Sequence, residues 1–329
     1  MRTSLCVGLF VSLLGRTSIA ADYPNAEISN KLIVAKLMLP DAMHGSYRGT
    51  RFDWSGIISS LQYGGHEYFG QWYEHHDPKI NDAITGPVEE FLTHDAGLGY
   101  DEAKAGGTFI RIGVGVIRNP EEKAFRRFDT YDIEDSGKWT IRKGRDWIGF
   151  THRLASDDGY AYLYRKTLRL TKGKPELVIA HSLKNTGRKV IETVQYNHNF
   201  FVIDHEVVGP DMFIRFPFVP QPAGDLKNGC GVQGQDITYT RELQKGEGVF
   251  TALGGYGNDA KDYDIRIENR KSGAGVHISG DQPLEKLLFW SIRTVASAEP
   301  YIQLGIKPGA ESHWKISYDF YTIAQTPAH

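Results

Sequence analysis

The stretch LVIAHSLKNTGRKVIETVQYNHNFF, Leu177 to Phe201, contains two runs of β-branched and aromatic residues on either side of Asn185-Thr186-Gly187. Such runs are typical of β-strands, and a turn of this composition between them predicts a β-hairpin. Most of the remaining sequence repeats the pattern, with short Val-, Ile-, Tyr-, Phe- and Thr-rich stretches broken by Gly, Asn, Asp and Lys. We therefore expect an all-β fold, a large antiparallel β-sandwich in which both faces of the central strands are covered.

Helical periodicity over three turns is hard to find in this chain. A turn or two of helix is plausible only near Glu89 to Thr93 and Asn119 to Lys123. The glycine-rich and charged segment from Thr85 to Asp135 has the composition of a long loop laid over the sheets. Ordered long loops in compact β proteins are more often functional than idle, so this segment is expected to contribute to a site.

The length and charge of the chain limit the classes of protein to which it can belong. The chain has 329 residues and a formal net charge of -2, with acidic and basic residues interspersed. The absence of a basic stripe argues against a nucleic-acid partner. The oligomeric state is not fixed by these features.

The first twenty residues, MRTSLCVGLFVSLLGRTSIA, have the features of a secretory signal peptide. Arg2 precedes an apolar run from Leu5 to Leu14, and Ser18 and Ala20 are small residues placed for cleavage before Ala21. We expect an exported protein, periplasmic or extracellular, in which residues 21–329 form one domain without a membrane span. Cleavage would remove Cys6 and leave Cys230 as the only thiol, so no intrachain disulfide is expected.

The second run of the opening stretch carries polar residues within an apolar strand. With the side-chain period of two, Tyr196, His198 and Phe200 share one face, whereas Asn197 and Asn199 share the other. An imidazole among aromatic rings must find a partner, because an unpaired polar group costs about 1–3 kcal/mol on burial. His198 is therefore either a satisfied core histidine or a catalytic group, since histidine titrates near neutral pH.

The motif Asn197-His198-Asn199-Phe200-Phe201, with two strand-like runs and a turn before it, resembles the Asn-His-x-Tyr/Phe-Phe motif of galactose mutarotases, the aldose 1-epimerases. The resemblance implies a single mutarotase-like sandwich, with His198 as the general acid in its cleft. It also implies a carbohydrate substrate, a mono- or oligosaccharide, whose anomers are interconverted by ring opening. Asn199 departs from the common motif, and the usual Arg and His-Gly-Gly signatures of the first half are absent.

Ring opening of a cyclic hemiacetal needs a base as well as an acid, and a carboxylate placed across the sugar from the histidine is the expected base. Glu299-Pro300, followed by Pro308-Gly309 and a last strand, resembles the arrangement of the hexose-6-phosphate mutarotase branch. The resemblance implies that Glu299 is the base. Taken alone, this carboxylate would more simply be a solvated group at the end of a strand.

Further residues are candidates for binding the substrate. Arg51 could hold sugar hydroxyls or an anionic group with its forked donors. Trp290 could stack on a pyranose ring, and Asn197 is included as a neighbour of His198. His66 and His75 lie in the aromatic stretch YGGHEYFGQWYEHHDPKI, but their order relative to the glycines does not match the family, so neither is preferred.

Five charged residues are more simply explained as solvated surface groups. Glu89 and Glu90 in GPVEEF, and the run Arg126, Arg127 and Asp129, belong to this class. No zinc-ligand spacing, P-loop or dinucleotide motif occurs, so no metal site and no cofactor are expected, while calcium stays open.

Three functions are compatible with this sequence. The first is an aldose 1-epimerase-like isomerase using His198 and Glu299. The second is a non-catalytic carbohydrate-binding protein with Trp72 and Trp290 as stacking platforms. The third is a polysaccharide lyase or glycosidase on the same fold, in which His198 or a tyrosine abstracts a proton and Arg51 neutralises a uronate.

Overall fold

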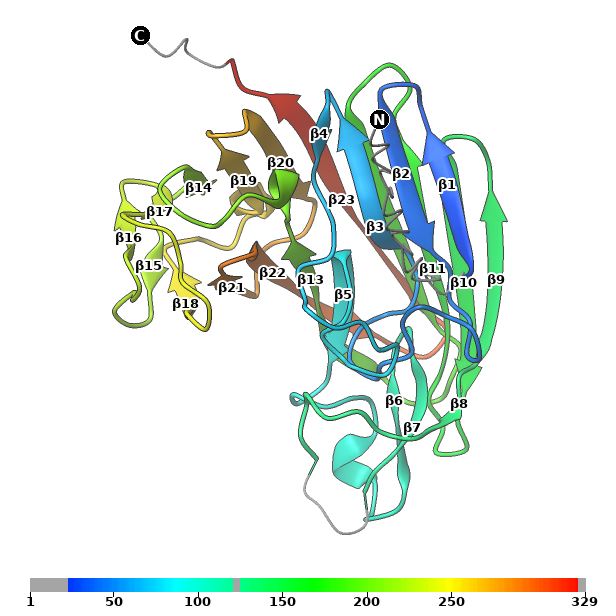
Figure 1. Cartoon of the computed structure of the whole chain (residues 1–329). Helices are drawn as coiled ribbons and strands as arrows, with labels where there is room; N and C mark the ends of the chain where they lie inside the picture. Colours follow the sequence, from blue (N-terminus) through cyan, green and yellow to red (C-terminus); the bar gives the residue numbers. More distant parts are fainter. Residues whose placement is uncertain (1–22, 121–124, 325–329) are drawn as a thin grey trace, which may run out of the picture.

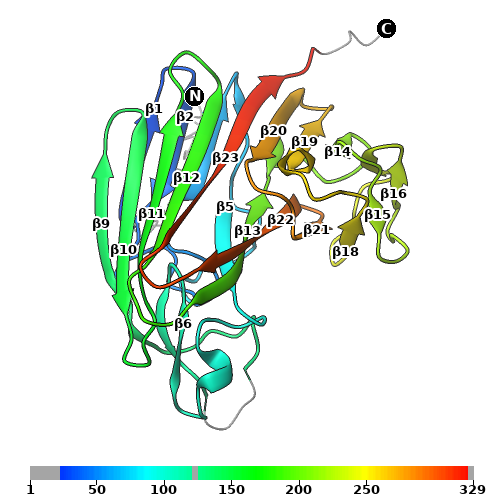
Figure 2. The ribbon, with the colours of Figure 1, turned by 180° about the vertical axis from the view of Figure 1, so that it is seen from behind.

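A computed structural model describes residues 23–120 and 125–324, so the expected signal peptide and its cleavage site lie outside the described residues. Four antiparallel sheets make up almost all regular structure in this part of the chain (Figures 1 and 2). The expectation of an all-β, antiparallel sandwich is thereby confirmed. No helix among these residues is long and apolar enough to cross a membrane.

The largest sheet has ten strands in the order β16-β17-β14-β19-β20-β23-β12-β11-β10-β9. In chain order its strands are β9 (Lys138–Lys143), β10 (Trp147–Ala155), β11 (Ala161–Leu170), β12 (Glu176–Asn185), β14 (Met212–Arg215), β16 (Cys230–Gln233), β17 (Asp236–Tyr239), β19 (Asp264–Asn269), β20 (Ala274–Gly280) and β23 (Glu311–Thr322). β23 crosses the molecule diagonally and joins the two halves of this sheet (Figures 1 and 2).

A six-stranded sheet lies beside it in the order β15-β18-β21-β22-β13-β5. Its strands are β5 (Gly86–Leu92), β13 (Ile191–Phe200), β15 (Gln221–Pro222), β18 (Gly248–Gly254), β21 (Lys286–Ile292) and β22 (Val295–Ile306).

Two smaller sheets and three single turns complete the fold. The four-stranded sheet contains β1 (Asn25–Ser29), β2 (Ile33–Met38), β3 (Ile57–Tyr63) and β4 (His66–Glu67), and the three-stranded sheet contains β6 (Thr108–Arg111), β7 (Gly115–Arg118) and β8 (Ile133–Asp135). The 3-10 turns are η1 (Tyr100–Glu102), η2 (Ile203–His205) and η3 (Ala260–Asp262).

Two apolar cores lie on opposite faces of the six-stranded sheet. The larger includes Ile179 of β12, Tyr318 of β23 and Phe201 just after β13. The smaller includes Tyr196 and Phe200 of β13. Both faces of β5, β13 and β22 are covered by other parts of the protein. Polar side chains on either face of these strands are therefore buried.

The predicted hairpin between the two runs of the opening stretch is wrong. β12 pairs with β11 and β23, so both of its edges are occupied, whereas β13 pairs with β22 and β5 in the other sheet. The turn carries the chain from one sheet to the other, and Thr186 and Gly187 donate their backbone N–H groups to Ala161 O. The connection that follows Asn185 therefore joins strands of two different sheets and is not a hairpin turn.

The segment from Thr85 to Asp135 is only partly the predicted loop. It contains β5, a fully buried strand at the edge of the six-stranded sheet, and the small sheet β6 to β8. The helical turn expected at Glu89 to Thr93 is wrong, because these residues belong to β5 and the bend after it. The turn expected at Asn119 to Lys123 lies mostly outside the described residues, and Asn119 itself is irregular.

Candidate active site

The alternation predicted for β13 is confirmed. Tyr196 and Phe200 pack in the smaller core, and His198 stands between them, stacked on Phe200 with ring centroids 3.7 Å apart. Asn197 and Asn199 point the other way, toward β23, where both contact the Tyr318 hydroxyl. The polar residues of this strand therefore serve two different environments.

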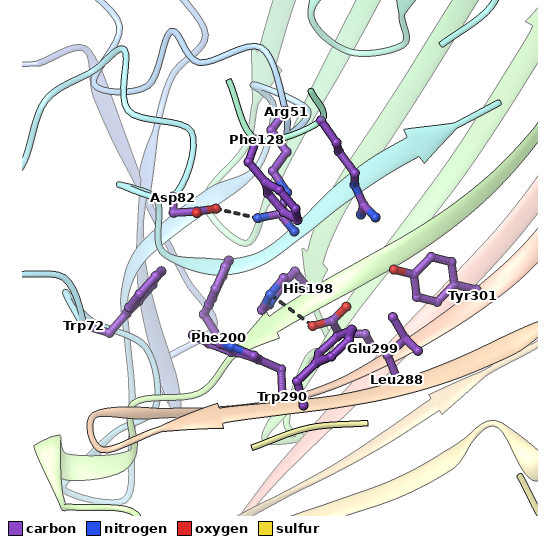
Figure 3. A pocket seen from close by; sticks show the side chains of 12 residues that line it. Arg51, Trp72, Asp82, Phe128, His198, Phe200, Leu288, Trp290, Glu299 and Tyr301 are labelled. Carbon is purple, nitrogen blue, oxygen red and sulfur yellow. Dashed lines mark hydrogen bonds and ion pairs between the residues drawn. The ribbon is translucent and has the colours of Figure 1, made fainter. Parts of the chain in front are cut away.

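Glu299 lies in the middle of β22 rather than at a strand end. Its side chain is on the same face of the six-stranded sheet as His198, and its Oε1 lies 3.1 Å from the imidazole Nε2 (Figure 3). Both side chains are 5% exposed, so the contact is almost completely shielded from solvent. The structure thus brings together the two residues that the sequence predicted as an acid and base pair, but they are in direct contact and do not face each other across a sugar-sized cleft.

The pair lies in the wall of a pocket of about 320 Å³, within the range of small-molecule sites. Aromatic rings form much of this wall. Trp72 stacks on Phe200 with centroids 5.0 Å apart, and Trp290 meets His198 edge-on at 5.3 Å. Phe128 and Phe250 also line the pocket, and they are 61% and 68% exposed.

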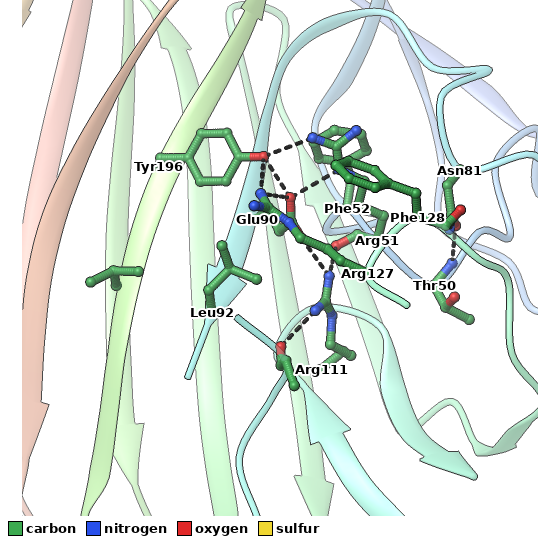
Figure 4. A network of polar contacts seen from close by, with 12 residues as sticks. Thr50, Arg51, Phe52, Asn81, Glu90, Leu92, Arg111, Arg127, Phe128 and Tyr196 are labelled. Carbon is green, nitrogen blue, oxygen red and sulfur yellow. Dashed lines mark hydrogen bonds and ion pairs between the residues drawn. The ribbon is translucent and has the colours of Figure 1, made fainter. Parts of the chain in front are cut away.

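A cluster of arginines, shown in Figure 4, contributes Arg51 and Arg127 to the lining of the pocket. The Glu90 carboxylate, which is fully buried, accepts hydrogen bonds from Arg51, Arg111 and Arg127. The Tyr196 hydroxyl also donates to this carboxylate, at 2.5 Å. Arg51 and Arg127 extend to the pocket surface, and Arg51 pairs there with Asp82. Guanidinium groups therefore outnumber the carboxylates that pair with them.

This environment changes the acidity of both members of the pair. Burial raises the pKa of Glu299 to about 7, against the opposing influence of Arg51 and Arg127. Burial also lowers the pKa of His198 well below its usual value, and the two arginines act in the same direction. Near neutral pH the unliganded site thus holds a neutral imidazole beside a carboxyl group that is partly protonated.

Polar atoms without partners surround Glu299. Among the described residues, His198 Nδ1, Ser297 Oγ and the Tyr301 hydroxyl are buried and have no hydrogen-bond partner. Ser297 and Tyr301 are two residues before and after Glu299, so all three share one face of β22. Buried groups of this kind normally have a partner, which indicates that a polar ligand or water completes the site.

The other predicted site residues divide into two groups. Arg51 and Trp290 line the pocket with His198 and Glu299. Asn197 does not, because it is fully buried on the opposite face and donates to Glu89. His66 lines a separate hollow, where its Nδ1 lies 2.8 Å from Asp204, and His75 is exposed and lines none of the described pockets.

Sequence reasoning missed or undervalued several pocket residues. The sequence predicts that Arg127 belongs to a solvated charge run and that Glu90 is a surface acid, yet Arg127 is only 19% exposed and pairs with the fully buried Glu90. Tyr301, Asp82 and Phe128 were not singled out. The strand period gives a signal for Tyr301, since it is two residues after Glu299, but none marks Asp82 or Phe128 before folding.

No group of three or more His, Cys, Asp or Glu side chains within residues 23–120 and 125–324 is arranged to hold a metal ion. Cys230, the thiol outside the expected signal peptide, is buried and free.

Comparisons with known proteins place the fold. No protein-family model and no curated protein matches the chain by sequence. Among solved structures, an Escherichia coli K12 protein whose assignment as an aldose 1-epimerase is provisional superposes with a TM-score of 0.57 at 11% identity, covering 91% of this chain and 99% of its own. A galactose mutarotase-like protein from Lactobacillus casei gives a TM-score of 0.54 at 14% identity, over 90% of this chain and all of its own.

The aldose epimerase homologue from C. elegans gives a TM-score of 0.51 at 13% identity, covering 91% of this chain and 99% of its own. At such identities these likenesses concern the fold alone. The chain has the galactose mutarotase-like β-sandwich fold, as the Asn197 to Phe201 motif suggested.

Proposed function

We propose that this protein is a carbohydrate-active enzyme of the aldose 1-epimerase type, which interconverts the anomers of a sugar by acid and base catalysed ring opening. The observation that carries the proposal is the contact between His198 and Glu299, 3.1 Å apart in the wall of an aromatic pocket. Fold alone would not support it, because one fold hosts many functions.

Ring opening removes a proton from the anomeric hydroxyl and adds one to the ring oxygen. These two oxygens are bonded to the same carbon, so the acid and the base can stand side by side rather than across the sugar. A proton held by Glu299 can pass to His198 over their short contact. The result is a carboxylate beside an imidazolium, which are the base and acid forms that the reaction requires.

The pocket offers contacts for a sugar around this pair. Trp290 and the exposed rims of Phe128 and Phe250 provide apolar surface for the C–H face of a pyranose. His198 Nδ1 and the Tyr301 hydroxyl lack partners that sugar hydroxyls would supply. Arg51 and Arg127 add donors at the opposite wall, so both the apolar and polar surfaces of a sugar would be matched.

The test is an exchange assay between anomers, started from α-glucose and from α-galactose and followed by NMR or polarimetry. We expect wild-type protein to accelerate equilibration, and we expect His198→Ala and Glu299→Gln to lose the acceleration by at least about 100-fold. Glu192→Gln, an exposed acid on the same strand β13, is the matched control and should retain full activity. Equal rates in the wild type and both site variants would reject the assignment.

A second candidate function is sugar binding without turnover, favoured by the exposed Phe128 and Phe250 rings at the pocket rim. It predicts saturable binding by calorimetry that persists in Glu299→Gln, with no acceleration of mutarotation by the wild type. Release of products absorbing in the near ultraviolet from a uronate polymer would instead indicate a lyase.

Export is proposed on the strength of residues 1–20 alone. Expression of the full chain should yield an exported mature protein whose N-terminal sequence begins at Ala21. An intact N-terminus in the cytoplasmic fraction would reject export.

A further inference from the structure

The ladder between β13 and β22 opens beside the candidate catalytic pair. Main-chain pairing runs from Ile191 opposite Ile306 to Tyr196 opposite Tyr301, and it resumes as a single bridge between Phe201 and Ala296. The two contacts are five positions apart in each strand, so the register is unchanged across the opening. In that register His198 stands opposite Glu299, and Asn199 stands opposite Ala298.

Pro300 explains why the ladder opens. Ala296 exchanges both of its backbone hydrogen bonds with Phe201, so its polar groups face β13. Backbone direction alternates along an antiparallel strand, so those of Ala298 and Pro300 face β13 as well. Proline has no N–H, and Pro300 therefore cannot donate to Asn197, which lies opposite it.

The Asn199 side chain replaces a missing main-chain bond. The Ala298 carbonyl accepts from Asn199 Nδ2 at 2.9 Å, while the backbone oxygen of Asn199 accepts instead from Phe201 N at 2.8 Å. On its other side, the Asn199 carboxamide oxygen accepts from the Tyr318 hydroxyl at 2.9 Å. The carboxamide is fully buried, so both contacts are shielded from water.

We propose that Asn199 is a positioning residue that sets the spacing between His198 and Glu299. Its carboxamide holds Ala298 one side-chain length from β13, and Glu299 follows Ala298 directly. A closed ladder would bring opposite Cα atoms to about 4.5–5.5 Å, whereas the opened one leaves the spacing to this side chain. The inference rests on the proposed acid and base roles, but the geometry of the pair can be tested without them.

The experiment compares Asn199→Ala with Tyr318→Phe. The first removes the donor to Ala298, and the second removes the hydroxyl on the other side of the same carboxamide while leaving that donor in place. In Asn199→Ala we expect kcat for mutarotation to fall on the order of 100-fold, as a small misplacement of reacting groups can cause, with KM little changed. Tyr318→Phe should keep kcat within about 3-fold of the wild type.

NMR titration of the His198 ring and the Glu299 carboxyl carbon in the unliganded variants gives a readout that does not depend on turnover. Displacement of β22 in Asn199→Ala should change both apparent pKa values, whereas Tyr318→Phe should leave them as in the wild type. If no variant and no wild-type sample catalyses mutarotation, the proposed function fails, yet the titration still decides the positioning role.

Unchanged titration and unchanged kcat in folded Asn199→Ala would overturn the proposal, as would equal changes in both variants. Should Asn199→Ala not fold, Asn199→Asp keeps the size of the side chain and its acceptor for Tyr318. The introduced carboxyl can donate to Ala298 only while it is protonated, so the titration of His198 should change as it ionises. A His198 titration identical to that of the wild type at all pH values would overturn the proposal.

Discussion

Glu299 combines a buried position with a charge that the proposed reaction needs. Its pKa of about 7, raised mainly by burial, means that the His198 and Glu299 pair keeps its one proton below about pH 7 and loses it above. Because His198 donates this proton to the ring oxygen, we expect kcat/KM for mutarotation to fall as the pH rises through about 7. The measurement is a pH profile of the exchange rate, and a profile that is flat between pH 5 and 8 would contradict this role.

The same raised pKa predicts a cost in stability. A carboxyl whose pKa is higher in the folded than in the unfolded state binds its proton more tightly when folded, so the protein loses stability as the pH rises from about 4.5 to about 7. The shift corresponds to about 3 kcal/mol. Glu299→Gln should therefore melt at a higher temperature than the wild type at pH 8 but similarly at pH 5, whereas Glu192→Gln should follow the wild type.

At the scale of single residues, the sequence distinguished His198 and Glu299 because each belongs to a local motif. It could not distinguish Arg126 from Arg127. The two are neighbours in one charge run, yet Arg126 is 77% exposed and Arg127 is 19% exposed and bonded to Glu90. Which arginine turns inward depends on Glu90, which lies 37 residues earlier in the sequence, in β5. A local sequence pattern does not show that this partner will be close in the folded protein.

At the scale of elements, the alternation of β13 was predictable but its partners were not. A period of two fixes which side chains share a face, whereas pairing depends on which strand edges are already occupied. β12 uses both edges, and its turn therefore becomes a crossing between sheets. Asn185 fits this role, because its Nδ2 donates to Lys189 O and Ile306 O, and its Oδ1 accepts from Gly187 N.

These contacts predict the effect of changing the crossing. Asn185→Ala leaves the buried Ile306 carbonyl without this donor and removes the bond that shapes the turn, so the free energy of unfolding should fall by about 1–3 kcal/mol. Thr186→Ala alters the exposed neighbour and should change it by less than about 0.5 kcal/mol. Urea unfolding of both variants checks the difference. Similar values for the two would show that the turn side chain does not hold the sheets in place.

At the scale of the whole molecule, the sequence predicted that both faces of the central strands are covered. It did not predict that charged side chains are buried between the sheets. Lys166 of β11 lies beside Arg165 in the stretch YAYLYRKTLRLT, and nothing in this stretch distinguishes it from a surface cation. In the structure it is fully buried, contacts Glu89 of β5, lies 3.5 Å from Asp53 and donates to Ser55 O at 2.7 Å. This cation joins the ten-stranded sheet to β5 and to the segment before β3.

His181 of β12 extends the link, with its Nε2 3.0 Å from Glu89 Oε1, and Asn197 of β13 donates to the same carboxylate. The asparagine that sequence reasoning assigned to substrate contact thus belongs to the connection between sheets. It lies directly behind the candidate site, so the network that holds the sandwich together also supports the strand that carries His198.

Removing the cation should therefore weaken the whole sandwich. Lys166→Met leaves the Glu89 and Asp53 carboxylates close together without their shared counter-ion, and removal of one partner from a buried pair costs about 3–5 kcal/mol. Arg165→Met, at the adjacent exposed position, should cost less than about 1 kcal/mol. Urea unfolding monitored by tryptophan fluorescence measures the free energy of unfolding of both variants.

The double variant Lys166→Met with Glu89→Gln should regain part of the lost stability, because it also removes one of the two negative charges. A Lys166→Met protein as stable as Arg165→Met would mean that water or a protonated carboxyl already satisfies this cluster, and that Lys166 does not stabilise the contact between the two sheets.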